Sequence, residues 1–160
     1  MRIGLGFDIH PLVSGRRLFL GGIEIPHQTG LLGHSDADVV IHALCDALLG
    51  AIGQGDLGEH FPDADPRYEG ISSLILLQSV MGMLQQQRYQ IWNLDVVILA
   101  DHPKLSPYKE GMRGKIAEQL GVKEKQVNIK ASSSNGLSFR AEGKESIAAY
   151  CVVLLREEDV

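Results

Sequence analysis

The feature that most constrains the fold is a helix predicted from about Asp36 to Leu49, in which apolar residues surround a short polar row. The apolar residues that cover most of its circumference are Val39, Ile41, Ala43, Leu44, Ala47 and Leu48. A helix covered in this way is largely buried. Residues four apart on a helix lie one above another, so Asp38, His42 and Asp46 form a row inside the protein. Buried polar groups cost free energy unless they are paired, so this row predicts either hydrogen-bonded core residues or a functional site.

A strand predicted over residues 2–10 offers two further polar side chains. Asp8 and His10 are two residues apart, so they project from the same face of the strand. If the strand packs against the helix, Asp8, His10 and His42 converge. Two imidazoles and one carboxylate leave a fourth tetrahedral position open, as in catalytic zinc sites. Asp46 would then accept the other ring N–H of His42. The alternative is a hydrogen-bonded core histidine without a metal.

The remaining segments predict strands and helices mixed within one domain that spans residues 1–160. A hairpin is predicted around Gly21 and Gly22, a helix from Ser72 or Ser73 to about Arg88, a helix from Ser106 to Leu120, and strands over residues 91–100, 127–133 and 146–157. We therefore expect the α+β class, with a mixed sheet and helices packed on one face; the α/β class is the alternative.

Charge and cysteine content exclude several classes of protein. The net charge of -5 argues against a general affinity for nucleic acid, whose phosphates require a basic surface. Cys45 and Cys151 lie in apolar runs and are expected to be buried free thiols, which suits a reducing compartment. The start of the chain has no secretory apolar block, and the longest apolar run, residues 147–155, is too short to cross a bilayer. We expect a cytoplasmic protein without membrane contact.

Four loops carry side chains suited to a phosphorylated ligand. His34 and Ser35 precede the first helix, where backbone N–H groups and the helix dipole favour an anion, and Asp36 is a candidate N-cap. Residues 56–65 contain three aspartates that would bind a divalent cation or sugar hydroxyls, or else form a solvated acidic loop. Residues 132–135 end a strand with serines and Asn135, which predicts a phosphate cradle or an unliganded turn. Lys104 lies between two prolines in a stiff loop that could hold a flat ring or only connect two elements.

Taken in order, several segments resemble one known family over nearly the whole chain. They are "RIGLGFDIHPL", "GGIEIP", "GLLGHSDADVVIHALCDALLGA", "GDLGEHFPDADP", "DVVILADHPKL", "VNIKASS" and "EGKESIAA". The chain resembles the 2-C-methyl-D-erythritol 2,4-cyclodiphosphate synthase family of the non-mevalonate isoprenoid pathway. The resemblance implies ferredoxin-like α+β subunits that form a homotrimer with active sites at the subunit interfaces. It also implies cyclisation of 4-diphosphocytidyl-2-C-methyl-D-erythritol 2-phosphate, whose 2-phosphate attacks the β-phosphorus and displaces CMP.

The resemblance also implies roles for individual residues. Asp8, His10 and His42 would bind one zinc ion per subunit, with Asp8 and His10 also touching substrate. His34 would lie near the reacting phosphates, beside Ser35, and Ser133 stands where the family has a phosphate-binding Thr that stabilises the transition state. The ribose contacts would be Asp56, Leu57 and Gly58, and the methylerythritol phosphate loop Phe61, Pro62, Asp63, Ala64 and Asp65. The cytosine pocket, reached from the neighbouring subunit, would be Ala100, Asp101, His102, Pro103, Lys104, Leu105 and Ser106, and further substrate contacts Ser132, Ser134, Asn135 and Phe139.

The segment 132–146 departs from the family pattern. Asn135 replaces the usual Glu that holds a second divalent ion, Mg²⁺ or Mn²⁺, between the substrate phosphates. An amide oxygen still ligates such an ion, but without charge. This segment favours an alternative function, a metal-dependent phosphodiesterase or nucleotide hydrolase built on the same zinc site. A non-catalytic trimeric ligand-binding protein is a third hypothesis.

Overall fold

The computed structural model of the chain describes residues 1–135 and 145–158. The strands are β1 (Arg2–Ser14), β2 (Leu18–Leu20), β3 (Ile23–Ile25), β4 (Thr29–Leu31), β5 (Tyr89–Leu99), β6 (Val127–Ser132) and β7 (Ser146–Glu157). The α-helices are α1 (Val39–Ile52), α2 (Leu57–His60), α3 (Ser73–Gln86) and α4 (Lys109–Leu120), with 3₁₀ turns over Pro66–Tyr68, Ser106–Tyr108 and Glu124–Gln126. The predicted hairpin, helices and strands are all present, with some boundaries shifted.

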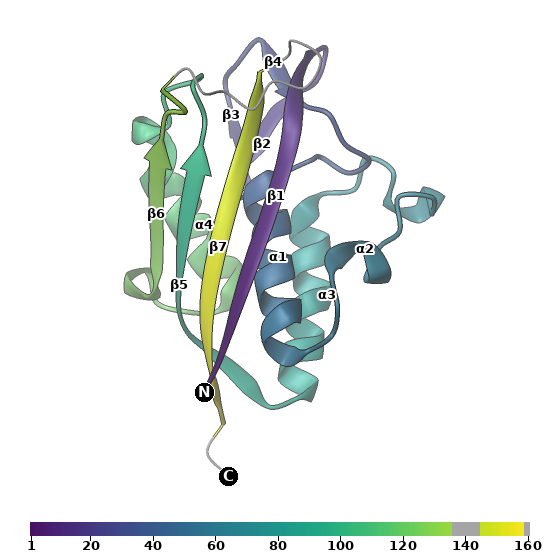
Figure 1. The fold of residues 1–160 in the computed structure, drawn as a ribbon, viewed down its shortest axis with the longest axis vertical. Helices are drawn as coiled ribbons and strands as arrows, with labels where there is room; N and C mark the ends of the chain where they lie inside the picture. Colours follow the sequence, from purple (N-terminus) through teal and green to yellow (C-terminus); the bar gives the residue numbers. More distant parts are fainter. Residues whose placement is uncertain (136–144, 159–160) are drawn as a thin grey trace.

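A five-stranded mixed sheet organises the molecule, in the order β4-β1-β7-β5-β6 (Figure 1). Only the β5–β6 pair within it is parallel; the other neighbours are antiparallel. The hairpin of β2 and β3 forms a separate two-stranded sheet. In Figure 1, α4 lies behind β5 and β7, while α1 and α3 lie beside β1. The mainly antiparallel sheet together with these helices confirms the α+β class.

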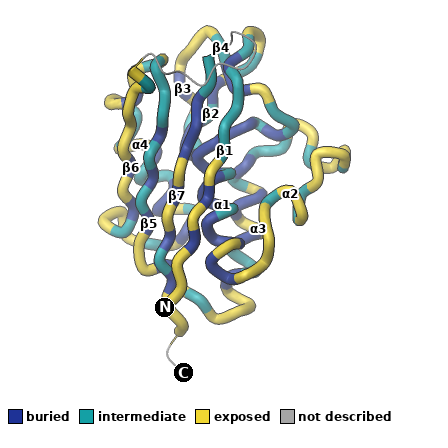
Figure 2. The backbone as a smooth tube through the Cα atoms, viewed as in Figure 1, coloured by how far each residue is buried: buried dark blue, intermediate teal, exposed yellow. Residues whose placement is uncertain are grey.

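The two faces of the sheet differ in exposure. The face toward the helices contributes to one core, in which Leu44, Leu48 and Val153 are fully buried. Parts of β1 and β7 are exposed (Figure 2), and several of the residues there are apolar. They are Ile3, Leu5, Phe7, Tyr150 and Val152, and the rings of Phe7 and Tyr150 lie 4.7 Å apart. The sheet therefore leaves an apolar surface without helical cover.

Two glycines of β1 allow α1 to lie directly on the strand. A Cβ atom at Gly4 would lie 1.8 Å from the backbone oxygen of Ala47, and one at Gly6 would lie 1.9 Å from that of Ala43. Real Cβ atoms do not approach other atoms this closely. The glycines thus set the short distance between strand and helix that lets His42 face Asp8.

The start of α1 is three residues later than predicted. Asp38 caps the helix, and its carboxylate accepts hydrogen bonds from the backbone N–H groups of Val40 and Ile41. Its two oxygens also accept from Gly21 and Gly22 of the hairpin turn, at 2.9 and 2.7 Å. Ala37 has a φ of +58°, which is incompatible with a right-handed helix at that residue. The helix continues past Leu49 to Ile52 and ends at Gly53 in the left-handed conformation.

Other predicted details can be compared directly. Ser72 caps α3 and Gly121 ends α4, as expected. The helix predicted to begin at Ser106 begins as a 3₁₀ turn and becomes α-helical at Lys109. Cys45 and Cys151 are buried and free, as predicted. Among the described residues, none of the helices has the length and apolarity that a membrane span requires.

Candidate metal centre and substrate pocket

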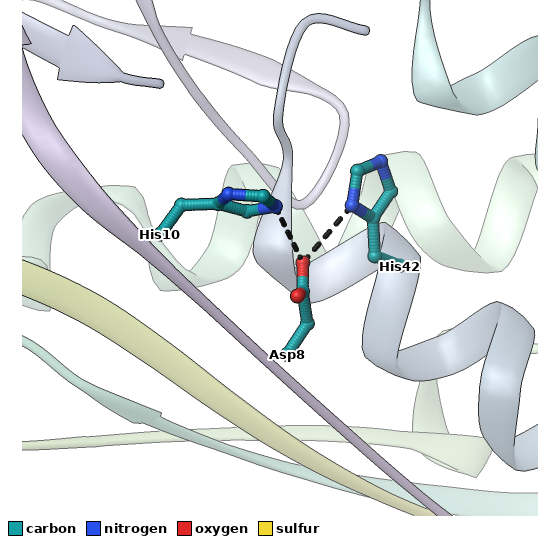
Figure 3. A group of neighbouring side chains, drawn as sticks. All are labelled: Asp8, His10 and His42. Carbon is teal, nitrogen blue, oxygen red and sulfur yellow. Dashed lines mark hydrogen bonds and ion pairs between the residues drawn. The ribbon is translucent and has the colours of Figure 1, made fainter. Parts of the chain in front are cut away.

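Three side chains from two elements converge on one point, as the sequence predicted (Figure 3). Asp8 and His10 come from β1, and His42 comes from α1. The Oδ2 atom of Asp8 lies 2.9 Å from Nδ1 of His42 and 3.2 Å from Nε2 of His10. The three candidate ligand atoms all lie within 4.8 Å of one another. This spacing allows a single metal ion to replace the hydrogen bonds between them.

The electrostatics of this group favour a charged carboxylate. Burial opposes ionisation of Asp8, but hydrogen bonds from His10 and His42 outweigh it and hold the pKa of the Asp8 carboxyl well below its usual range. Burial also works against a charged His42, but the hydrogen bond with Asp8 prevails and raises the pKa of the His42 imidazole. An anionic oxygen beside two imidazoles is a donor set that suits Zn²⁺, with room for a fourth ligand.

The second nitrogen of His42 bonds to two hydroxyls rather than to Asp46. Its Nε2 lies 2.8 Å from Oγ of Ser73 and 3.1 Å from Oγ of Ser35. The Oδ1 atom of Asp46 instead accepts from the backbone N–H of Leu57, at 2.8 Å. The predicted role of Asp46 as the partner of His42 is therefore corrected: Asp46 secures the start of α2. Burial, together with the charges of Asp56 and Asp8, raises the pKa of the Asp46 carboxyl.

A pocket of about 300 Å³ opens beside the candidate metal ligands. Its lining is Asp8, His10, Gly33, His34, Ser35, His42, Asp46, Asp56, Leu57, Gly58, Phe61, Asp63, Tyr68 and Leu76. The structure thus places four separate predicted segments around one cavity, namely β1, the loop before α1, α1 itself and the loop around α2. Asp56 also caps α2 by accepting from the N–H of Glu59 at 2.9 Å.

The loop that carries His34 and Ser35 is held from both sides. The Arg16 guanidinium donates to the backbone oxygens of Gly33, at 3.0 Å, and Ser35, at 2.6 Å. On the other side, the backbone N–H of Gly70 donates to the oxygen of His34 at 2.8 Å. The side chain of His34 contacts the Asp65 backbone oxygen through Nε2 at 3.2 Å.

Asp65, in the predicted methylerythritol phosphate loop, has contacts within its own turn. The Asp65 carboxylate forms a salt bridge with Arg67 at 2.6 Å, and it caps the turn that begins at Pro66. Pro62 and Ala64 are exposed in the same loop. Phe61 and Asp63 are the members of this segment that line the pocket.

The predicted cytosine and phosphate segments meet elsewhere in the chain, at the carboxyl ends of the parallel strands β5 and β6. The N–H and hydroxyl of Ser134 both donate to the Asp101 carboxylate, at 2.8 and 2.6 Å. The backbone N–H of Ala100 donates to the oxygen of Ser132 at 3.0 Å. Because β7 lies between β1 and β5, this group and the metal ligands come from different parts of the sheet.

Several residues of this second group have partners of their own. The hydroxyl of Ser133 donates to Oδ1 of Asn135 at 2.9 Å. The Leu105 side chain is buried in the core, whereas His102, Lys104 and Ser106 are exposed and Pro103 is half-buried. Phe139, which the resemblance also implicated, lies outside the described residues, as does most of the segment that departs from the family pattern.

Sequence reasoning missed four residues that shape the site: Arg16, Tyr68, Ser73 and Leu76. Tyr68 and Leu76 line the pocket. They share no helical or strand repeat with the other lining residues, so no local pattern predicts their position. Ser73 was noticed only as a helix cap. Arg16 belongs to no motif in the sequence, and only the placement of its loop beside Gly33 and Ser35 reveals its contacts with their backbone oxygens.

The fold and the site together define an α+β protein with a candidate metal centre at the edge of an acidic pocket. The particular family follows from comparison with known proteins. A model of the YgbB family matches residues 1–156, and the chain belongs to this family.

Named relatives specify the kind of enzyme. A 2-C-methyl-D-erythritol 2,4-cyclodiphosphate synthase of Syntrophotalea carbinolica (strain DSM 2380 / NBRC 103641 / GraBd1) is 52% identical over 98% of this chain and 95% of that protein. The same enzyme of Alkaliphilus metalliredigens (strain QYMF) is 56% identical over 96% of each. A solved 2C-methyl-D-erythritol-2,4-cyclodiphosphate synthase in a CDP-bound form is 36% identical, with a TM-score of 0.89 over 97% of this chain and 100% of that chain. The chain is accordingly an enzyme of the lyase type.

Proposed function

We propose that this chain, acting as one domain over residues 1–160, converts 4-diphosphocytidyl-2-C-methyl-D-erythritol 2-phosphate to 2-C-methyl-D-erythritol 2,4-cyclodiphosphate and CMP. An oxygen of the 2-phosphate bonds to the β-phosphorus, and the bond from that phosphorus to the bridging oxygen breaks, so that CMP leaves with the electron pair. The observation that carries the proposal is the Asp8, His10 and His42 group at one pocket with Asp56, Gly58 and Phe61. Relatives at 52–56% identity with this named activity support it.

Zinc is the metal that the donor set fits, because two imidazole nitrogens and one carboxylate oxygen lie close enough to share one ion. Asp8, His10 and His42 would hold it. When bound, such an ion supplies positive charge that polarises a phosphoryl oxygen and offsets the repulsion between two phosphate groups. A second ion, Mg²⁺ or Mn²⁺, would be bound by the substrate diphosphate, with Asn135 as a neutral protein ligand.

The residues around the pocket orient the substrate rather than provide a strong base. The attacking phosphate is already an anion, so positioning and electrostatic stabilisation supply most of the acceleration. Oγ of Ser35 accepts the N–H of Ala37 at 3.1 Å, and its own proton can be donated to a phosphoryl oxygen. His34, on the loop held by Arg16, would contact the reacting phosphates. Asp56 would accept a hydrogen bond from a ribose hydroxyl, and Phe61 with Asp63 would enclose the methylerythritol part.

The complete site is proposed to form between subunits of a homotrimer. Residues 100–106 and 132–135 lie at the ends of β5 and β6, on the far side of β7 from the candidate metal ligands, so one subunit would not gather all predicted contacts. The exposed apolar surface of β1 and β7 supports association, since contiguous apolar surfaces on soluble proteins commonly mark interfaces. A CDP-bound structural relative supports a nucleotide pocket. The expected location is the cytoplasm.

Phosphorus NMR of the products tests the proposed reaction. The purified enzyme with Zn²⁺, Mg²⁺ and substrate should yield a cyclic diphosphate and CMP. His42→Ala should abolish turnover and remove the tightly bound metal while the protein remains folded. A linear phosphate product formed by attack of water would instead establish the metal-dependent hydrolase, and absence of turnover in the metal-loaded wild type would indicate a ligand-binding protein.

Mixing of inactive subunits tests the position of the site. Lys104 is exposed, so Lys104→Glu should weaken nucleotide binding without disturbing the fold. If each site combines His42 of one subunit with Lys104 of another, refolding His42→Ala and Lys104→Glu chains together should restore part of the activity. Activity no greater than the sum of the two separate variants would place the whole site within one subunit.

A further inference from the structure

The ring of His42 is enclosed by partners on both of its nitrogens. Nδ1 faces the Asp8 carboxylate at 2.9 Å, while Nε2 faces the Ser73 and Ser35 hydroxyls at 2.8 and 3.1 Å. The side chain of His42 is only 12% exposed, and Ser73 is 1% exposed. The contacts of Nε2 therefore lie behind the face that His42 turns toward the candidate metal position.

The direction of each hydrogen bond follows from the chemistry of the partners. The hydroxyl of Ser73 is in close contact with Oδ1 of Asp36, and an ionised carboxylate only accepts, so Ser73 donates to Asp36. A lone pair of the Ser73 oxygen then faces Nε2 of His42 and accepts a hydrogen bond from Nε2–H. The oxygen of Ser35 accepts the N–H of Ala37 and provides a second acceptor beside Nε2. The network thus favours a proton on Nε2, which leaves Nδ1 as the nitrogen that can give its lone pair to a metal ion once that ion replaces the hydrogen bond to Asp8.

Backbone contacts fix Asp36 in place. Its Oδ2 accepts the N–H of Ser73 at 3.0 Å, and its own backbone N–H donates to the oxygen of Ile71 at 3.0 Å. Asp36 therefore joins the loop before α1 to the start of α3, and Ser73 is the link between that junction and the ring on α1.

We propose that Asp36 and Ser73 form a positioning pair that holds His42 in the tautomer and orientation required to ligate the metal through Nδ1. The inference rests on the metal role of His42 in the proposed function. It adds that two linked hydrogen bonds, from Nε2–H of His42 to Ser73 and from Ser73 to Asp36, strengthen metal binding. Partners of ligating histidines generally act in this way, by orienting the ring and raising its basicity. Neither Asp36 nor Ser73 needs to touch the substrate for this role.

The zinc dissociation constant, measured by competition with a coloured chelator, tests the pair without reference to turnover. Ser73→Ala should weaken zinc binding about 10- to 100-fold. Asp36→Asn retains an amide oxygen as acceptor but loses the charge, so it should weaken binding less. Ser72→Ala is the matched control, because Ser72 caps the same helix through the N–H of Leu74 and, among the described residues, forms no hydrogen bond with His42. Its dissociation constant should equal that of the wild type.

The ring tautomer provides a second measurement. Long-range ¹H–¹⁵N spectra of the zinc-loaded protein should show His42 protonated at Nε2, with that proton exchanging with water faster in Ser73→Ala than in the wild type. A dissociation constant for Ser73→Ala within about twofold of the wild type, or an equal loss in Ser72→Ala, would overturn the positioning role. If Ser73→Ala does not fold, the zinc dissociation constant of Asp36→Asn is compared instead, and a value within about twofold of the wild type would overturn the positioning role. Full zinc retention by His42→Ala would instead overturn the metal assignment of the proposed function.

Discussion

Replacement of Gly6 by alanine should disrupt the contact between β1 and α1. The added Cβ would lie 1.9 Å from the Ala43 backbone oxygen, about 1 Å short of the 3.0 Å that real Cβ atoms respect. A backbone oxygen cannot rotate away as a side chain can, so the helix and strand must separate. Overpacking of this kind typically costs about 1–3 kcal/mol, and we expect about 3 kcal/mol because the obstructing atom belongs to the backbone.

The same displacement should weaken metal binding. A shift of α1 by about 1 Å moves His42 away from Asp8 and His10, whereas metal sites tolerate errors of only about 0.2 Å in ligand distance. Gly50→Ala is the matched control on the same helix: Gly50 is exposed, and nothing lies within 4 Å of its would-be Cβ. This change should stabilise the protein by about 0.5–1 kcal/mol, because alanine loses less entropy in a helix than glycine does.

The assay is urea unfolding of the metal-free proteins, followed by zinc titration. The free energy of unfolding should be highest for Gly50→Ala, intermediate for the wild type and lowest for Gly6→Ala. Zinc affinity should be reduced only in Gly6→Ala. Gly6→Ala with the stability and zinc affinity of the wild type would refute the claim that direct backbone contact positions His42.

Three further predictions concern the site. Arg16→Ala should lower kcat about 10- to 100-fold in steady-state kinetics, because the loop that carries His34 loses two hydrogen bonds; an unchanged kcat would mean that Arg16 does not set the loop. Asn135→Glu should tighten the Mg²⁺ or Mn²⁺ dependence, since a charged ligand replaces a neutral one; an identical metal titration would show that this residue does not contact the second ion. Zinc affinity should fall as the pH decreases through the raised pKa of His42, because the proton then competes with the metal for Nδ1; chelator competition at several pH values checks this, and a flat profile would contradict it.

Local patterns predicted much of the fold. The apolar circumference of α1 and the two-residue spacing of Asp8 and His10 were sufficient to predict a buried helix facing a strand and three converging side chains. These patterns succeed because helical and strand periodicity fix which side chains share a face. The start of α1 was misjudged because the capping group is Asp38, held also by the hairpin, while the left-handed conformation of Ala37 excludes an earlier start.

Long-range partners could not be predicted in the same way. The contact of Nε2 of His42 with Ser73 joins residues 31 positions apart, and the contact of Asp46 with Leu57 depends on how the chain leaves α1. Asp46 follows His42 by one helical turn, and this spacing predicts a contact between them. Tertiary packing instead places the hydroxyls of Ser73 and Ser35 beside Nε2 of His42. The clamp by Arg16 likewise depends on the placement of one loop against another.

The charge of the pocket has a consequence for the order of events during turnover. Asp8, Asp46, Asp56 and Asp63 line it, and its described lining contains no lysine or arginine. A polyanion that approaches this recess is repelled until bound cations reverse the local sign. Loading of the ion should therefore precede productive capture of the nucleotide. When zinc and the nucleotide substrate are added together to the metal-stripped enzyme, turnover should begin after a lag. The length of this lag should depend on the zinc concentration rather than on the nucleotide concentration.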